Sequence, residues 1–450
     1  MIKIISLHPL RGKTIRLSPP QILALGFLVF IIVGTLLLKL PFATTVSVSW
    51  LDALFTATSA ITVTGLVVVD TGSAYSLFGE IVIMSLMQLG GLGLMTFSVL
   101  LLMMLRRKVG LHQRILTQES LNLNEASIGG LLRLVKLLFV FSIAIEAIAF
   151  VLLSIRWIPE YGWSEGIHQS VFHSISAFNN AGFSLWSDSL SGYVGDPLVN
   201  IVITGLFITG GLGFTVLVDI WDKKSFRKLS LHSKLMLVGT FIINITALLT
   251  LFILEFSNPE TIGSFSFTDK LWGSYFQAVT PRTAGFNSLP IAEMTVPSIL
   301  LLMLLMFIGA GSGSTGSGIK VTTFIVMLLA TVSFLRGKSE TTVFNRMIKV
   351  HTIVRALSIM IISILAIFIA VFILSITEAA PIMEIIFEVI SAFGTVGLSM
   401  GLTTDLTSFG KCIIMVMMFI GRLGPLTLAF VFARQKQSSI RHPEEEVFTG

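Results

Sequence analysis

The sequence has very little cysteine and very little charge. A single cysteine, Cys412, stands in a chain of 450 residues, which excludes an internal disulfide and a metal site built from several thiolates. The seven histidines show no paired ligand spacing, and the chain carries no nucleotide-binding motif and no catalytic constellation. We therefore expect a protein that is not an enzyme and binds no nucleotide itself. Only 12% of the residues are charged, too few for the surface of a soluble protein of this length.

Apolar residues dominate the composition. They make up 54% of the chain, and the mean hydropathy is +0.91. This composition predicts an all-α integral membrane protein, whose immediate partner is the lipid bilayer. The net charge of +6 does not indicate nucleic acid, because the basic residues cluster at the ends of apolar segments, where a membrane explains them better.

The basic residues also predict an orientation. Of the 30 Lys and Arg, 23 lie in five groups, at 3–16, 106–136, 223–234, 336–355 and 434–441. The long stretches between these groups carry almost none. By the positive-inside rule, the five groups are cytoplasmic, so we expect a multi-pass protein of the cell membrane with both termini in the cytoplasm.

Four segments of the chain align on one glycine. They read "FTATSAITVTGL", "FHSISAFNNAGF", "YFQAVTPRTAGF" and "FEVISAFGTVGL", and their aligned glycines are Gly65, Gly182, Gly285 and Gly397. A glycine-rich marker follows each of them: "LGGLG", "TGGLG", "IGAGSG" and "IGRLG". Four matches in one register indicate an internal repeat.

Each repeat predicts a spanning helix, a short re-entrant helix, the aligned glycine and a second spanning helix interrupted by glycine. The re-entrant helix has about a dozen residues, too few to cross a hydrocarbon core of ~30 Å at ~1.5 Å per residue. Its non-helical exit leaves carbonyls unpaired, which a membrane protein tolerates where the backbone is buried or lines a watery cavity. Four exits around one axis would form a ring of carbonyl oxygens that replaces the water shell of a cation. Four hairpins packed by glycine without a pore are the alternative, but they do not explain the common register.

The predicted fold is therefore four tandem membrane-pore-membrane repeats around a central pore, with eight spanning helices and four re-entrant pore helices. The predicted boundaries are a cytoplasmic N-terminus (1–20), repeat one (21–108), repeat two (109–222), repeat three (223–335), repeat four (336–434) and a cytoplasmic tail (435–450).

The run "GAGSGSTGSGIK" at 309–320 interrupts an apolar segment in repeat three. Because each glycine disfavours a helix by roughly 1 kcal/mol relative to alanine, its composition favours a mobile loop. A helix with a small-residue packing face is an alternative. A phosphate-binding loop is disfavoured, because Ile319 separates Gly318 from Lys320 and valine follows. Arg422, placed well inside a predicted span of repeat four, is a functional candidate by default, because a charge there is costly.

These motifs, in this order, resemble the Trk/Ktr/HKT superfamily of cation transporters, and most closely the membrane subunits of bacterial Ktr potassium uptake systems. The resemblance covers nearly the whole chain. It implies uptake of K+ through a channel-like pore driven by the electrochemical gradient, with dependence on Na+ left open. It also implies a homodimer regulated by a cytosolic ring of RCK-type nucleotide-binding subunits. An ion-coupled secondary transporter of a small solute is the alternative function.

The resemblance assigns two groups of site residues. The backbone of the first group would form a selectivity filter that binds potassium: Val63, Thr64, Gly65, Asn180, Ala181, Gly182, Thr283, Ala284, Gly285, Thr395, Val396 and Gly397. The second group would form an intramembrane gate below it: Gly309, Gly311, Ser312, Gly313, Ser314, Thr315, Gly316, Ser317, Gly318, Lys320 and Arg422.

Overall fold

The computed structural model of the protein describes residues 19–104 and 128–425, together with Thr427, Glu445 and Phe448. The predicted cytoplasmic N-terminus (1–20) and tail (435–450) lie almost entirely outside the described residues, as does most of the basic segment 106–136. Nearly all of the described secondary structure is helical. In chain order the elements are α1 (Pro19–Leu38), α2 (Trp50–Thr62), α3 (Thr71–Ala74), α4 (Leu77–Met104), α6 (Ile128–Phe178), η2 (Ser191–Tyr193), α7 (Pro197–Leu212), α8 (Phe214–Lys223), η3 (Phe226–Lys228), α9 (Leu231–Glu255), α10 (Phe267–Val279), η4 (Ile291–Glu293), α11 (Val296–Phe307), α12 (Val321–Leu335), β1 (Thr342–Val343), β2 (Arg346–Met347), α13 (Val350–Thr377), α14 (Ile382–Gly394), α15 (Leu402–Asp405) and α16 (Ser408–Leu423).

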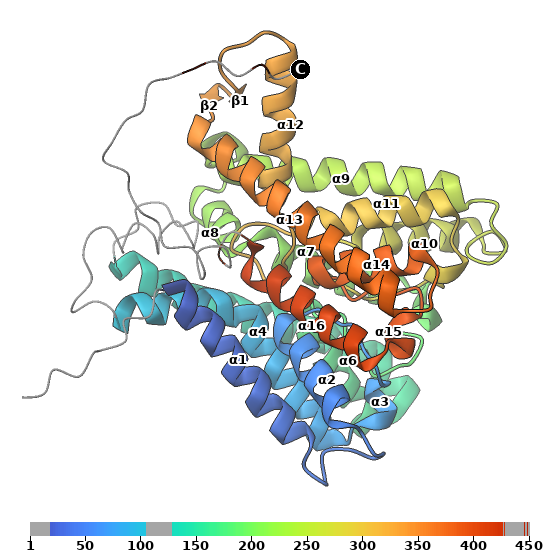
Figure 1. Ribbon diagram of the computed structural model, residues 1–450. Coiled ribbons are helices and arrows are strands. Elements are labelled where there is room, and N and C mark those ends of the chain that lie inside the picture. The colour runs from blue at the N-terminus through green and yellow to red at the C-terminus, as the bar shows by residue number, and fades with distance from the viewer. Residues whose placement is uncertain (1–18, 105–127, 426, 428–444, 446–447, 449–450) are drawn as a thin grey trace, which may run out of the picture.

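One small hairpin departs from the all-α prediction. Strands β1 and β2 pair antiparallel, with Thr342 opposite Met347. The two residues between the strands, Phe344 and Asn345, both have positive φ (+49° and +57°), which is the geometry of a two-residue hairpin turn. The hairpin joins the long helices α12 and α13 at the edge of the molecule (Figure 1).

Among the described residues, four helices are long and apolar enough to cross a membrane, and a fifth span arises if one bent pair is counted as a unit. The four are the first helices of the predicted repeats: Gln21–Leu38, Lys136–Phe178, Leu231–Glu255 and Val350–Thr377. In repeat two the spanning and re-entrant helices run together as α6, which is broken at Gly162 (φ +82°).

The second helices differ from one repeat to the next. In repeat two, α7 and α8 meet at 93° across Gly213 (φ +100°), and in repeat three a loop separates α11 from α12. Helix α16 of repeat four ends at Gly424 (φ +84°). In repeat one, however, the prediction of an interrupted helix is wrong, because α4 continues unbroken through Gly90. That glycine serves close packing instead, since a Cβ on it would meet the carbonyl oxygen of Ile61.

In repeats one and four, hydrogen bonds bring the two ends of the segment that contains the short helix next to each other. In repeat one, the chain before α2 is bonded to the chain that follows the aligned glycine, with Thr45 N donating to Ala74 O (3.0 Å) and Ser76 N to Ala43 O (3.0 Å). In repeat four, Glu378 at the end of α13 accepts a bond from Thr407 N at the start of α16 (2.9 Å). At 13 residues, α2 and α14 are each about 20 Å long, so both are too short to span.

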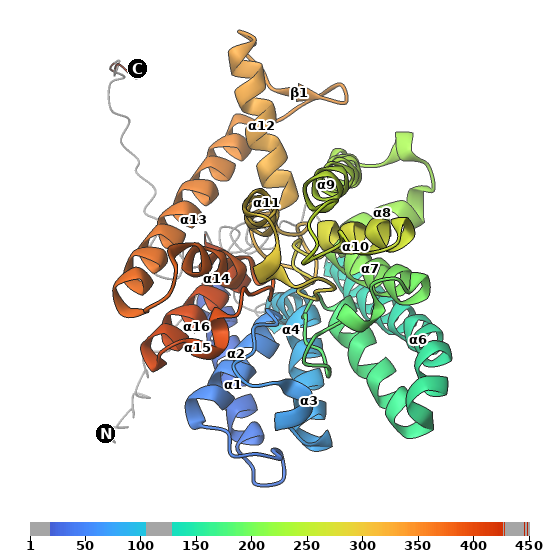
Figure 2. The same ribbon diagram turned by 90° about the vertical axis from the view of Figure 1, so that its right-hand side faces the viewer.

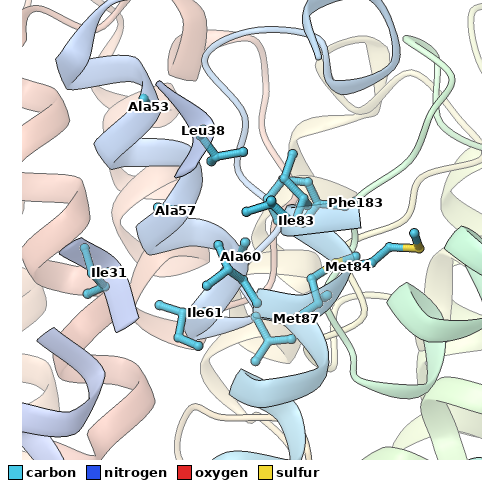
Figure 3. Close-up of a cluster of buried hydrophobic side chains, with 14 of the residues drawn as sticks. Ile31, Leu38, Ala53, Ala57, Ala60, Ile61, Ile83, Met84, Met87 and Phe183 are labelled. Carbon is cyan, nitrogen blue, oxygen red and sulfur yellow. The ribbon is translucent and has the colours of Figure 1, made fainter. Parts of the chain in front are cut away.

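The elements of the four repeats occupy successive sectors around a common centre, with the predicted repeats coloured from blue to red (Figure 2). Apolar clusters join neighbouring sectors. In one cluster, Ala53, Ala57 and Ala60 lie along one face of α2 and allow α1 and α4 to approach closely (Figure 3). Phe183 of repeat two packs into the same cluster. The packing thus fixes how the segment after each short helix sits against its neighbour.

Candidate functional site

The backbone at the four aligned glycines has an unusual and repeated conformation. All four glycines have positive φ, between +69° and +97°. The residue two positions earlier also has positive φ in every repeat, although none of these is a glycine: Val63 (+55°), Asn180 (+58°), Thr283 (+70°) and Thr395 (+47°). Left-handed conformations are costly for side chains with a Cβ, so four at equivalent positions indicate a backbone held by its surroundings.

The four non-helical segments at the aligned glycines contact one another in a closed ring. A Cβ on each glycine would meet the carbonyl oxygen of the residue that precedes the glycine of the next repeat, and the fourth repeat contacts the first. The pairs are Gly65 with Ala181 O, Gly182 with Ala284 O, Gly285 with Val396 O and Gly397 with Thr64 O. The structure therefore brings together all twelve residues of the first predicted group, and all are buried except Gly182 and Gly397, which are partly exposed. We call these residues the glycine ring.

Hydroxyl groups behind the glycine ring hold its backbone. Ser59 Oγ accepts a bond from Gly65 N (3.1 Å), and Ser391 Oγ accepts one from Gly397 N (3.2 Å). Ser176 Oγ donates to the carbonyl of Phe183 (2.8 Å). All three are the serines found six residues before the glycine.

Repeat three differs by one residue. The position that aligns with the serines holds Val279, and the next residue, Thr280, supplies the hydroxyl, donating to Phe286 O (2.5 Å). The backbone bond that closes the exit also spans one residue fewer, from Ala284 N to Thr280 O (3.0 Å), where repeat one has Thr64 N to Ser59 O (2.8 Å). The sequence alignment could not show this shift, because it matched the glycine and not the end of the helix.

Residues 309–320 form an irregular loop between α11 and α12, so the packed-helix alternative is wrong. The base of the loop is closed by a bond from Ala310 N to Ser317 O (3.1 Å). The rest lies against the break in α7, with Gly311 N donating to Gly211 O (2.8 Å) and Thr315 N to Gly210 O (3.2 Å). We call this segment the 309–320 loop.

The 309–320 loop touches the glycine ring directly. A Cβ on Gly316 would collide with the hydroxyl of Thr283. Lys320 folds back on the loop and donates to Gly316 O (2.9 Å). Any other residue at position 316 would have to displace the side chains of Thr283 and Ala310, so the glycine allows the loop to approach repeat three.

Arg422 joins the 309–320 loop to repeat one. Its guanidinium donates to Thr315 O, to Ser317 Oγ (3.0 Å) and, on the other side, to Gly90 O (2.5 Å). The side chain is buried, and no carboxylate pairs with it among the residues that the structure describes. Carbonyl dipoles compensate for its charge, and the arginine fork fixes the loop and α4 at one distance.

Gly210→Ala tests how closely α7 is packed against this site. A Cβ on Gly210 would meet the carbonyl oxygen of Phe178 and lie 2.8 Å from Thr315 Oγ1. We expect a loss of about 1–3 kcal/mol of stability, seen as a lower melting temperature of the purified protein in detergent. Gly205→Ala on the same helix is the matched control, because nothing lies within 4 Å of its Cβ. Equal melting temperatures for the two variants would contradict the close packing.

Sequence reasoning missed the side chain of Asn180. It considered only the backbone carbonyls of the ring residues. The side-chain amide of Asn180 also makes hydrogen bonds, to the 309–320 loop and to repeat three. The available signal was weak: asparagine is among the residues that best tolerate a left-handed backbone, which suggests a backbone role and says nothing of the amide.

Comparisons with known proteins agree with one another. The profile of the family TrkH, described as cation transport protein, matches residues 21–442. The chain is 60% identical over 438 residues to the Ktr system potassium uptake protein B of Bacillus subtilis (strain 168), covering 97% of this chain and 98% of that protein. It is 40% identical over 444 residues to the potassium/sodium uptake protein NtpJ of Enterococcus hirae, covering 97% and 98%. The crystal structure of the potassium transporter TrkH from Vibrio parahaemolyticus has the same fold, with a TM-score of 0.74 at 20% identity over 94% of this chain and 86% of that one.

Proposed function

Since the chain belongs to the TrkH family of cation transport proteins, we propose that it is the pore-forming membrane subunit of a potassium uptake system. The glycine ring carries this proposal. Carbonyl oxygens of four repeats surround one axis, and such a ring replaces the hydration shell of a potassium ion. The relatives whose names specify potassium uptake cover nearly the whole chain, including all four ring segments.

In this proposal the twelve ring residues form the selectivity filter, and the 309–320 loop with Arg422 forms a gate beneath it. Ions run down the electrochemical gradient, since the membrane potential contributes ~2.3 kcal/mol per charge per 100 mV. Sodium is the second cation to test, because one relative is named for both ions. Membership of a cation transport family favours this function over the secondary transporter of a small solute.

The assembly belongs to the same proposal. We propose a homodimer in the cell membrane with both termini in the cytoplasm, regulated by a cytosolic ring of RCK-type nucleotide-binding subunits. The support is the similarity to a subunit of a Ktr system and the distribution of Lys and Arg along the sequence.

Rubidium uptake into proteoliposomes tests this function. With a negative internal potential, we expect vesicles that contain the full-length chain to accumulate rubidium faster than empty vesicles, and excess external potassium to compete. Repeating the measurement with sodium, and with the partner ring added, tests the two finer parts of the proposal. Correctly inserted protein that takes up no rubidium under any of these conditions would refute the potassium pathway.

A further inference from the structure

The side chain of Asn180 reaches from the glycine ring to the 309–320 loop. Its Oδ1 accepts a hydrogen bond from Thr315 Oγ1 (2.8 Å), in the middle of the loop. Its Nδ2 donates to Thr283 Oγ1 (3.3 Å), in the ring segment of repeat three. All three side chains are fully buried. One amide thus bridges two quarters of the ring and the loop beneath them.

Two glycines make room for this bridge. A Cβ on Gly210 would lie 2.8 Å from Thr315 Oγ1 and 2.9 Å from Asn180 Oδ1. A Cβ on Gly316 would strike Thr283 Oγ1. Gly210 lies in the last turn of α7 in repeat two and Gly316 lies in the loop of repeat three, and a side chain at either position would crowd the polar contact.

The bridge is confined to one half of the ring. The positions equivalent to Asn180 in repeats one and four are Val63, which has no polar atom in its side chain, and Thr395. The Thr395 hydroxyl has no hydrogen-bond partner in the part of the chain that the structure describes. Side-chain hydrogen bonds from these ring positions to the loop therefore come from the half of the ring formed by repeats two and three.

We infer that Asn180 couples cation occupancy of the glycine ring to the position of the 309–320 loop. This inference rests on the proposed function, in which the ring binds potassium. Asn180 has a left-handed backbone (φ +58°), a conformation that costs a residue with a Cβ free energy unless something holds it. A cation that draws the Asn180 carbonyl toward the axis stabilises this conformation, and the same backbone angles aim the amide at Thr315. In a ring without a cation the carbonyls move apart, and the loop loses its hydrogen bond from Thr315 to the Asn180 amide.

Cysteine modification measures this coupling directly. Cys412 is exposed and is replaced by alanine, and Ser312→Cys then places one thiol in the buried loop. In proteoliposomes of the full-length protein, we expect a small thiol reagent to label Cys at 312 about fivefold more slowly in potassium than in N-methylglucamine, the effect of one net hydrogen bond. Asn180→Ala and, separately, Thr315→Val should remove the difference, because each breaks the bridge.

Thr209→Val is the matched control, since it removes a hydroxyl of α7 that donates to Gly205 O and Leu206 O (2.8 Å each) and lies outside both the ring and the loop, and we expect it to keep the potassium effect on labelling. The double variant Asn180→Ala with Thr315→Val should equal the single variants, because both remove one bridge. Rubidium uptake by the same vesicles reports the proposed function separately. A protein that takes up rubidium but whose labelling rate ignores potassium would overturn the coupling alone. So would a potassium effect that survives both Asn180→Ala and Thr315→Val.

Discussion

Gly65→Ser is expected to lower the potassium-to-sodium permeability ratio about tenfold, a loss of ~1.4 kcal/mol of discrimination. The Cβ of the new residue would occupy the space of the Ala181 carbonyl oxygen and lie 3.0 Å from Gly182 Cα. Since both are backbone atoms of the ring in repeat two, the collision cannot be relieved by turning a side chain. The quarter of the ring between repeats one and two must open, and the carbonyl cage then fits potassium less well.

The measurement is the relative flux of rubidium and sodium into proteoliposomes under the same membrane potential. Gly401→Ser separates the collision from backbone strain, because Gly401 also has positive φ (+108°) but nothing lies within 4 Å of its Cβ. We expect this control to retain the original selectivity. If Gly65→Ser also retained it in well-folded protein, the ring would not be the selectivity filter.

The register of the four ring segments could be predicted from the sequence because the same contact recurs in every repeat and requires the same residue type each time. A glycine is required wherever a Cβ would meet the backbone of the next repeat, and the four aligned glycines all satisfy this condition. The 309–320 loop was predictable for a related reason, since its composition opposes a helix whatever surrounds it.

Other features depend on contacts between segments far apart in the chain. The glycines of "LGGLG" and "TGGLG" look alike in the sequence, but α4 continues where α7 bends by 93°. The difference lies in the neighbours. The backbone of the loop bonds to Gly210, Gly211 and Phe214 at the bend, while at the matching place in α4 the carbonyls of Gly90 and Gly91 accept bonds from the side chain of Arg422. The backbone N–H and C=O groups that lose their helical partners at the bend find new partners in the loop, and helix propensity does not predict this.

The same limit applies to side chains. The prediction that Arg422 is functional rests on the cost of a charge in a span, but the partners of Arg422, the carbonyls of Thr315 and Gly90, come from repeats three and one. The bridge made by Asn180 joins repeats two and three in the same way. Residue type thus singles out candidate residues in the sequence, and only the fold shows which segments they connect.

Deletion of residues 311–316 is expected to raise rubidium flux about tenfold and to weaken control by the partner ring. The structure makes this deletion feasible, because Ala310 and Ser317, the residues it would join, are already hydrogen-bonded at the base of the loop (3.1 Å). Helices α11 and α12 lie outside the deleted segment. The deletion removes Thr315 and Gly316, the residues that contact the ring from below, and with them the proposed barrier.

Arg422→Ala should act in the same direction. Without the guanidinium, the loop loses its attachment to α4 at Gly90, and hydrogen bonds that involve a charged group are worth about 1.5–3 kcal/mol each. Arg422→Lys is the matched control, because lysine keeps the charge but lacks the fork that reaches the loop and α4 together, so we expect an intermediate flux. Combining the deletion with Arg422→Ala should raise flux no further than either change alone, since both remove one barrier. Flux that stays at or below the wild-type level in a stable, well-inserted deletion variant would refute the gate. Fully additive effects of the two changes would show that Arg422 acts on the pore independently of the loop.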